Sequence, residues 1–252
     1  CSSDLEKSLL FLIIIKSLGY NIKMAIMIGV GRCPPTSKAE GRKPIMLKEI
    51  NLVFHRRGLR SFIEVDLCAD CPRRDHKGCC GHYSPVFYLT DLYFIAKQRP
   101  QLIDYIAELP FLTVLDASIT VNSIPDKDGS SRCQFHSLEK GCLLPMELRE
   151  SVCRHFVCPG IAWDKESRLA HWKEYFDLLG NYEIDLNNYL AARISQENLS
   201  LRRQGDWKPI MALLETVMEQ VLAEEEELGC HLPREEEVQI VRPICFGSEW
   251  PL

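Results

Sequence analysis

The chain has 252 residues, of which 46% are apolar and 26% are charged. It is long enough to bury a core as one large domain or two small ones, and its composition is ordinary for a globular protein. The net charge of −5 and the isoelectric point near 5.9 exclude a chain that is basic over its whole surface, so nucleic acid is not an expected partner.

Residues 1–45 are interpreted as a leader and linker that is not native to the functional domain. The chain begins with Cys1 rather than methionine, which indicates a fragment or an over-extended reading frame, and Met24, Met27 and Met46 are candidate starts. A lipid-carrying cysteine at the first position is the alternative. Proteins of that kind usually continue with a polar tether, whereas this chain continues directly into a helical pattern.

The pattern within this leader predicts one helix and one linker. Ser3 and Glu6 form a capping-box pattern, and a helix to about Leu18 follows. The longest apolar run, 9–15, has seven residues. A membrane span needs about 20, so none is expected. Residues 29–44 are rich in glycine, proline and charge, which is typical of a linker.

Between residues 62 and 109 the sequence predicts a strand and then two helices. The segment FIEVDL, residues 62–67, alternates as a short strand does. Residues 89–109 have a helical pattern with Asp91 as the expected N-cap. Pro100 divides this pattern, because proline is accepted in the first turn of a helix but not in its interior.

The next segment predicts the small β component of the fold. Residues 111–121 are rich in β-branched residues and predict a strand. Residues 125–131 predict a turn, and 132–136 predict a second strand that returns along the first.

The last third of the chain is predicted to be helical. Residues 164–179 and 184–194 carry apolar side chains at three-four spacing. The clearest helix runs from 206 to 229 and ends at Gly229; its apolar stripe comprises Ile210, Leu213, Leu214, Val217, Met218, Val221 and Leu222. The acidic runs 224–227 and 235–237 predict solvated faces. We therefore expect a fold that is mostly α, with a small β-hairpin and an irregular cysteine-rich metal-binding core.

Eight of the twelve cysteines lie in two dense groups. A chain of this size does not need disulfides to hold a small core together, so the groups indicate another use for the thiols. The first group is spaced C-x2-C-x7-C-C and the second C-x8-C-x10-C-x4-C. The eight residues are Cys68, Cys71, Cys79, Cys80, Cys133, Cys142, Cys153 and Cys158.

This pattern predicts a metal site. Two cysteines separated by two residues can turn both sulfurs toward one metal, as zinc and iron–sulfur sites require. Neighbouring side chains in extended backbone point to opposite sides, so the adjacent Cys79 and Cys80 favour a polynuclear cluster or two paired centres. Three histidines near the cysteines are further candidate ligands: His82, His136 and His155.

A thiolate centre is anionic, and a buried anion needs compensating charge. The candidate cations flank both groups: Arg73, Arg74, Lys77, Lys140, Arg149 and Arg154. Positive neighbours also lower the pKa of a thiol, which favours the ligating thiolate.

The chain resembles the YkgJ-like CxxCxxCC zinc- or iron-chelating domain family. The resemblance rests on CADC, GCC, the YLTDLYFIA helix and RCQFHSLEKGCLLPMELRESVCRHFVC, and covers about residues 60–165. It implies that all eight cysteines hold a metal. Two features depart from the family pattern: seven residues separate Cys71 from Cys79, and Arg149-Glu150 replaces Arg-Pro.

Three functional hypotheses follow for residues 46–165, with 166–252 as a helical extension. The first is a cytoplasmic metal-binding protein, with a 4Fe–4S cluster favoured over structural zinc, an electron-transfer or cluster-dependent role, and a redox or other protein partner still to be identified. The second is a thiol-redox enzyme using Cys68 and Cys71. The third, implied by related flagellin lysine methylases, is a cluster-containing methylase, although the chain has no convincing S-adenosylmethionine motif.

Overall fold

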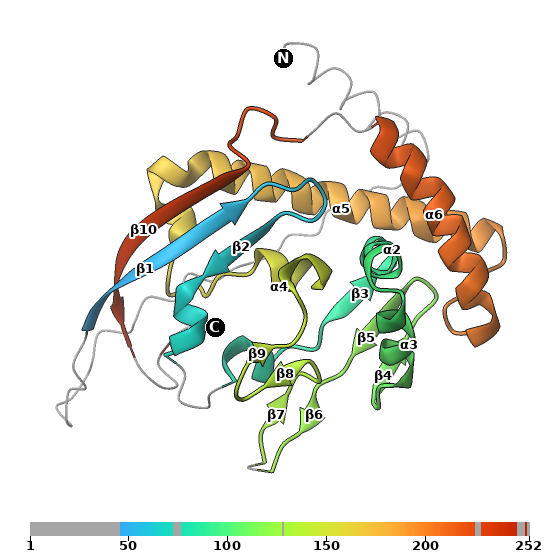
Figure 1. Cartoon of the computed structure of the whole chain (residues 1–252), viewed down its shortest axis with the longest axis horizontal. Helices are drawn as coiled ribbons and strands as arrows, with labels where there is room; N and C mark the ends of the chain where they lie inside the picture. Colours follow the sequence, from blue (N-terminus) through green and yellow to red (C-terminus); the bar gives the residue numbers. More distant parts are fainter. Residues whose placement is uncertain (1–45, 73–76, 128, 225–227, 246–249, 251–252) are drawn as a thin grey trace.

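The computed structural model describes residues 46–72, 77–127, 129–224, 228–245 and 250. The predicted leader helix, the linker and the candidate cations Arg73 and Arg74 lie outside these residues. The described residues are about 47% helical and 22% strand and form four small sheets, so the expectation of a mostly helical fold with one hairpin is wrong. The fold is mixed α and β (Figure 1).

The described residues form the following helices, strands and turns. The strands are β1 Met46–His55, β2 Phe62–Val65, β3 Val86–Tyr88, β4 Leu112–Val114, β5 Ser118–Val121, β6 Ile124–Pro125, β7 Ser131–Arg132, β8 His136–Ser137, β9 Gly141–Cys142 and β10 Glu235–Ile244. The α-helices are α2 Leu89–Gln98, α3 Gln101–Glu108, α4 Ser151–His155, α5 Ala170–Gln196 and α6 Trp207–Glu224. The 3-10 turns are η1 Asp66–Asp70, η2 Gly78–Gly81, η3 Met146–Leu148, η4 Trp163–Lys165, η5 Ser167–Leu169 and η6 Gln204–Asp206.

The largest sheet joins the two ends of the described chain in the antiparallel order β10-β1-β2. Neither long strand was predicted from the sequence. The reason is local: β10 begins with three glutamates, so an apolar residue first occupies one of its inner positions at Val238. On the inner face, Phe54 stacks on Trp172 of α5 at 5.1 Å between ring centroids, so α5 covers this face.

The second sheet has the order β3-β5-β4 and lies beside α2 and α3 (Figure 1). The two helices split at Pro100 are confirmed, and β2 confirms the predicted strand over 62–65, whereas residues 66 and 67 belong to η1. The single strand predicted at 111–121 is divided into β4 and β5, which pair with each other. The N-cap of α2 is Tyr88 rather than Asp91. The carboxylate of Asp91 lies three residues into the helix and accepts a hydrogen bond from the Tyr88 N–H at 3.1 Å.

In the C-terminal helices, the predicted apolar periodicity agrees with the structure more closely than the predicted helix boundaries do. Residues 170–179 and 184–194 of the two predicted segments belong to one continuous helix, α5, whereas residues 164–169 lie in and between the turns η4 and η5. The α6 stripe faces the core, with Ile210, Leu214 and Met218 almost completely buried. Among the described residues, no helix is both long and apolar enough to cross a membrane.

The predicted returning strand at 132–136 is divided between two short ribbons. Arg132 ends β7, which pairs with β6, whereas His136 begins β8, which pairs with β9. Cys133 lies between the two ribbons, and its N–H donates to the Cys80 carbonyl at 2.6 Å. This contact joins the segments that carry the two cysteine groups.

Candidate metal centre

One cavity of about 370 Å³ collects all eight predicted cysteines. Its walls come from η1, η2, β8, β9 and α4 and from the loops that connect them. In Figure 1, α4, β8 and β9 lie in the middle of the molecule, between the two larger sheets. The other two described cysteines, Cys230 and Cys245, do not line this cavity.

The first cysteine group lies on two 3-10 turns. Cys68 belongs to η1 and Cys71 follows it directly, whereas Cys79 and Cys80 belong to η2. The expectation that the Cys79 and Cys80 side chains point to opposite sides is therefore wrong, because it assumed extended backbone. The two thiols hydrogen-bond to each other instead of pointing to opposite sides.

Gly78 makes the approach of Cys71 to η2 possible. Its φ is +52°, a backbone conformation that a residue with a Cβ adopts only with strain. A Cβ at this position would lie 2.9 Å from the Cys71 sulfur. Glycine is therefore required here both for the turn and for the position of the thiol.

The second cysteine group depends on α4, whose N-terminus is capped by Glu150. The carboxylate of Glu150 accepts hydrogen bonds from the N–H groups of Val152 at 3.0 Å and of Cys153 at 2.7 Å. It is almost completely buried and also hydrogen-bonds the thiol of Cys153. Cys158 lies just beyond this helix, and Cys142 lies on β9.

The electrostatic neighbours of the thiols form two groups that do not follow the sequence. Cys68 interacts electrostatically with Cys71, Cys79 and Cys158. Cys158 interacts in the same way with Cys79 and Cys71. We call these four the Cys68 group. The remaining four, the Cys133 group, are connected by interactions of Cys133 with Cys142 and Cys153 and by its backbone hydrogen bond to Cys80: Cys80, Cys133, Cys142 and Cys153. Cys79 also interacts with Cys80 and Cys133, so it lies at the junction of the two groups.

The pKa values of five of these thiols are raised, mainly by burial. Burial raises the pKa of Cys133 and of Cys158 to about 11, and it raises the pKa of Cys153 with the help of the Glu150 carboxylate. A hydrogen bond with Cys80, together with burial, raises the pKa of Cys79. Cys68 is exposed to solvent on one side, but the protein that surrounds its thiol on the other side removes water and raises its pKa as well.

A buried network of four charges holds α4 against the core. Arg154 is fully buried and pairs with Glu183 of α5, and its guanidinium also donates to the Ser61 carbonyl at 2.8 Å. Arg60 pairs with Asp91 of α2 at 2.8 Å. Two positive and two negative groups balance, which is the condition for keeping charges in an interior.

Only some of the predicted compensating cations lie beside the cysteines. Lys77 and Arg149 line the cysteine cavity, and the charge of Arg149 partly opposes the rise in the pKa of the Cys68 thiol. Lys77 also pairs with Asp126 at 2.9 Å. Arg154 belongs to the buried network instead of the cavity wall, and Lys140 is exposed.

Two of the three candidate histidines line the cavity, namely His82 and His136. His155 does not, because its ring packs edge-on against Phe176 at 5.0 Å. The Nδ1 atom of His136 is buried and has no hydrogen-bond partner within the described part of the chain. A buried polar atom without a partner is rare, and in a cavity wall it is available to a bound group.

Sequence reasoning missed Glu150 and Trp250. Glu150 carried no signal, because glutamate is not among the preferred N-cap residues. Trp250 is buried, and its indole N–H lies near the Cys158 sulfur, where it partly opposes the rise in the pKa of that thiol without meeting the geometry of a full hydrogen bond. Nothing in the local sequence connects Trp250 with Cys158.

The donor set suits a metal, although the side chains surround a space instead of converging on one point. In the ranges that the structure describes, no three cysteine, histidine or carboxylate side chains already form a metal site. The chemistry of eight thiols around one cavity, together with the unpartnered Nδ1 of His136, fits a bound metal group.

Substitution of Gly78 by alanine is expected to lower metal content in addition to straining the turn. Gly58 provides the matched control, since its φ is +55° and a Cβ there would meet nothing within 4 Å. Each substitution should cost about 1–2 kcal/mol of unfolding free energy from backbone strain. Urea unfolding and metal analysis of both variants measure this, and equal metal content in the two would contradict a role for Gly78 in placing Cys71.

Comparison with models of known protein families, with curated proteins and with solved structures found no match for this chain.

Proposed function

We propose that this protein binds metal through the eight cysteines of the central cavity, and that the bound group is an iron–sulfur cluster. The observation that carries the proposal is the meeting of two cysteine groups, separated in sequence, around one cavity of about 370 Å³. Eight thiols do not gather in this way merely because cysteine is a small buried residue. The resemblance to the zinc- or iron-chelating domain family points in the same direction and rests on the same residues.

The size of the cavity favours a cluster over a single zinc ion. Four thiolates lie about 2.3 Å from one zinc, so a structural zinc site closes tightly around the metal. The cavity has the volume of about twelve waters, at about 30 Å³ for each. Eight thiols in two sets of four also suit two centres, with Cys79 and Cys80 at their junction.

The role proposed for the cluster is electron transfer or a cluster-dependent reaction. A cluster of this kind supplies a one-electron redox couple, while the protein sets its potential through burial and through donors near the sulfurs. Here the indole N–H of Trp250 lies near the Cys158 sulfur, and the positive charge of Arg149 acts on Cys68. The exposed position of Cys68 leaves one edge of the site within reach of a partner.

The competing hypotheses are weaker on the same geometry. A redox dithiol needs a thiol of lowered pKa, whereas the pKa of Cys68 is raised. Structural zinc is the second candidate, because four-cysteine zinc sites hold loop-rich segments together without further chemistry, and 3-10 turns and two-residue ribbons make up much of this site. For the methylase hypothesis, none of the described residues that line the cavity has an assigned role in methyl transfer.

Anaerobic purification followed by analysis of iron, sulfide and zinc tests the proposal. We expect iron and acid-labile sulfide in equal amounts, with visible absorption that bleaches on reduction. A colourless protein with stoichiometric zinc would overturn the cluster in favour of structural zinc. A protein that binds neither metal after reconstitution with iron and sulfide, or with zinc, would overturn metal binding altogether.

A further inference from the structure

The lysine and arginine residues of the β10-β1-β2 strands all lie on one face of the sheet. Side chains alternate along a strand, and the register places Glu49, Val53 and their strand neighbours on the outward face. The basic residues of these strands lie on the other face. There, Lys48 pairs with Asp70 at 2.5 Å and Arg242 with Glu166 at 2.5 Å.

The outward face is consequently acidic. We call it the acidic face and define it by its five exposed carboxylates: Glu49, Glu64, Asp66, Glu235 and Glu237. Among the described residues of the three strands, no lysine or arginine lies at an outward position. His55 lies between Glu64 and Glu235, at 3.5 and 3.2 Å from their oxygens. At one end of the sheet, Arg57 pairs with Glu147 at 2.9 Å.

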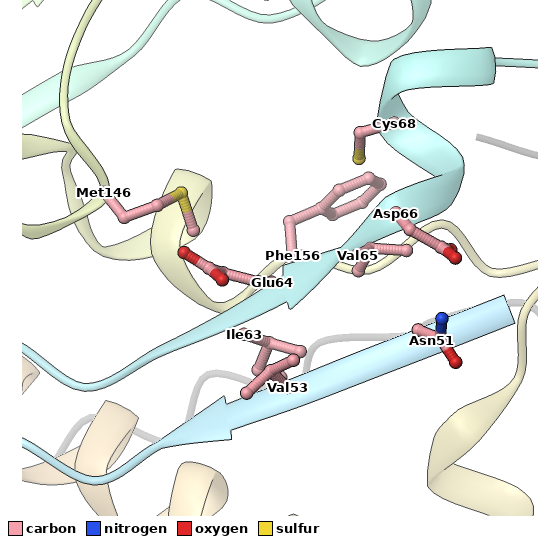
Figure 2. A pocket seen from close by; sticks show the side chains of 9 residues that line it. All are labelled: Asn51, Val53, Ile63, Glu64, Val65, Asp66, Cys68, Met146 and Phe156. Atoms are coloured by element: carbon pink, nitrogen blue, oxygen red, sulfur yellow. The ribbon is translucent and has the colours of Figure 1, made fainter. Parts of the chain in front are cut away.

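A second cavity, of about 340 Å³, opens where this face meets the cysteine site. Figure 2 shows its walls: Glu64 and Asp66 extend from the β2 side, and Met146 and Phe156 come from the segments around α4. Its lining also includes Asn51, Val53, Ile63, Val65 and Cys68. Three of these residues, Val65, Cys68 and Phe156, line the cysteine cavity as well. The second cavity is thus the outer neighbour of the proposed metal centre.

The chemistry of this second cavity suits a cation on an aliphatic stem. Glu64 and Asp66 supply negative charge, and Phe156 supplies an aromatic ring of the kind that attracts cations. Met146 and Val53 supply apolar surface for the methylene groups of lysine or arginine. Nucleic acids and anionic lipid surfaces are repelled by the same carboxylates.

We propose that the acidic face docks a lysine- or arginine-rich surface of a protein partner, with one basic side chain inserted into the second cavity beside Cys68. Five carboxylates provide charge complementarity to such a surface, and the adjacent cavity has both acidic and apolar lining for a cationic side chain. The docking surface would hold the partner next to the edge of the cysteine site. This docking site is formed by the sheet and the second cavity, so the proposal does not depend on which metal the cysteines bind.

The test is binding of a short fluorescein-labelled oligolysine peptide to the full chain, followed by fluorescence anisotropy at low and at physiological salt. We expect salt-sensitive binding of oligolysine and none of an oligoglutamate peptide. The combined variant Glu64→Gln, Asp66→Asn and Glu237→Gln should bind about tenfold more weakly, because it removes three of the five docking charges. Val53→Phe, which fills the cavity without changing charge, should also weaken binding severalfold.

A matched variant separates local docking from net charge. Asp104→Asn, Glu108→Gln and Glu197→Gln together remove the same charge from exposed positions on α3 and just beyond α5, away from this sheet. Equal weakening by the two triple variants, or no effect of Val53→Phe, would overturn the proposal. Circular dichroism melting and metal analysis of every variant keep a folding defect or a failure of metal binding distinguishable from a failure of docking.

Discussion

Replacing Cys79 by serine is expected to weaken metal binding by about a hundredfold or more, since the loss of a residue that merely supports a ligand already costs about 10–100-fold. Cys79 interacts with thiols of both cysteine groups and hydrogen-bonds to Cys80. Cys153→Ser should have a similar effect through the Cys133 group. Competition with a chelator of known affinity measures both. Cys230→Ser is the matched control, because Cys230 is exposed and lies outside the cavity wall.

Paired substitutions test the division of the cysteines. Cys71 and Cys158 come from different sequence clusters but belong to the same Cys68 group. The double variant Cys71→Ser/Cys158→Ser should therefore lose no more metal than either single variant. Cys71→Ser/Cys153→Ser should lose the metal of both centres. The reverse pattern, with losses that follow the sequence clusters, would contradict the grouping, and unchanged metal content in the Cys79 and Cys153 variants would contradict the site.

Replacing Arg154 by methionine is expected to lower the free energy of unfolding by about 3–5 kcal/mol, because it leaves a buried carboxylate without its partner. Arg154 is fully buried, and Glu183, its partner on α5, is 4% exposed. Without this pair, α4 loses its main polar attachment to the core, so Cys153 should also be held less firmly. Urea unfolding of the metal-free and metal-loaded forms measures the two effects separately.

Arg202 provides the matched control for this prediction. It forms a comparable pair with Asp116 at 3.3 Å, but its side chain is 56% exposed. Arg202→Met should cost at most about 1 kcal/mol, as exposed ion pairs do. The double variant Arg154→Met/Glu183→Met should be more stable than Arg154→Met alone, since it removes the unpaired charge. A double variant less stable than the single one would contradict this account of the network.

Part of the fold was readable because it is encoded over short distances. The stripe from Ile210 to Leu222 repeats with the period of a helix, and Pro100 marks a boundary through its own geometry. The strand at Phe62 alternates within a few residues. By contrast, β1 and β10 are strands because they pair with each other across nearly the whole described chain, and three glutamates at the start of β10 hide that alternation.

The donor set of the candidate site could be predicted from the residues alone, because the number and density of the cysteines and the charges beside them are properties of the chain. The neighbours of each thiol depend on the folded chain, since Cys158 reaches the first group through the path of the chain after α4. Likewise, the 3-10 turn that brings Cys79 against Cys80, the charge network around Arg154 and the acidic face each depend on contacts between distant segments. Such contacts form only when packing overcomes the entropy of closing long loops, and local periodicity carries no record of that balance.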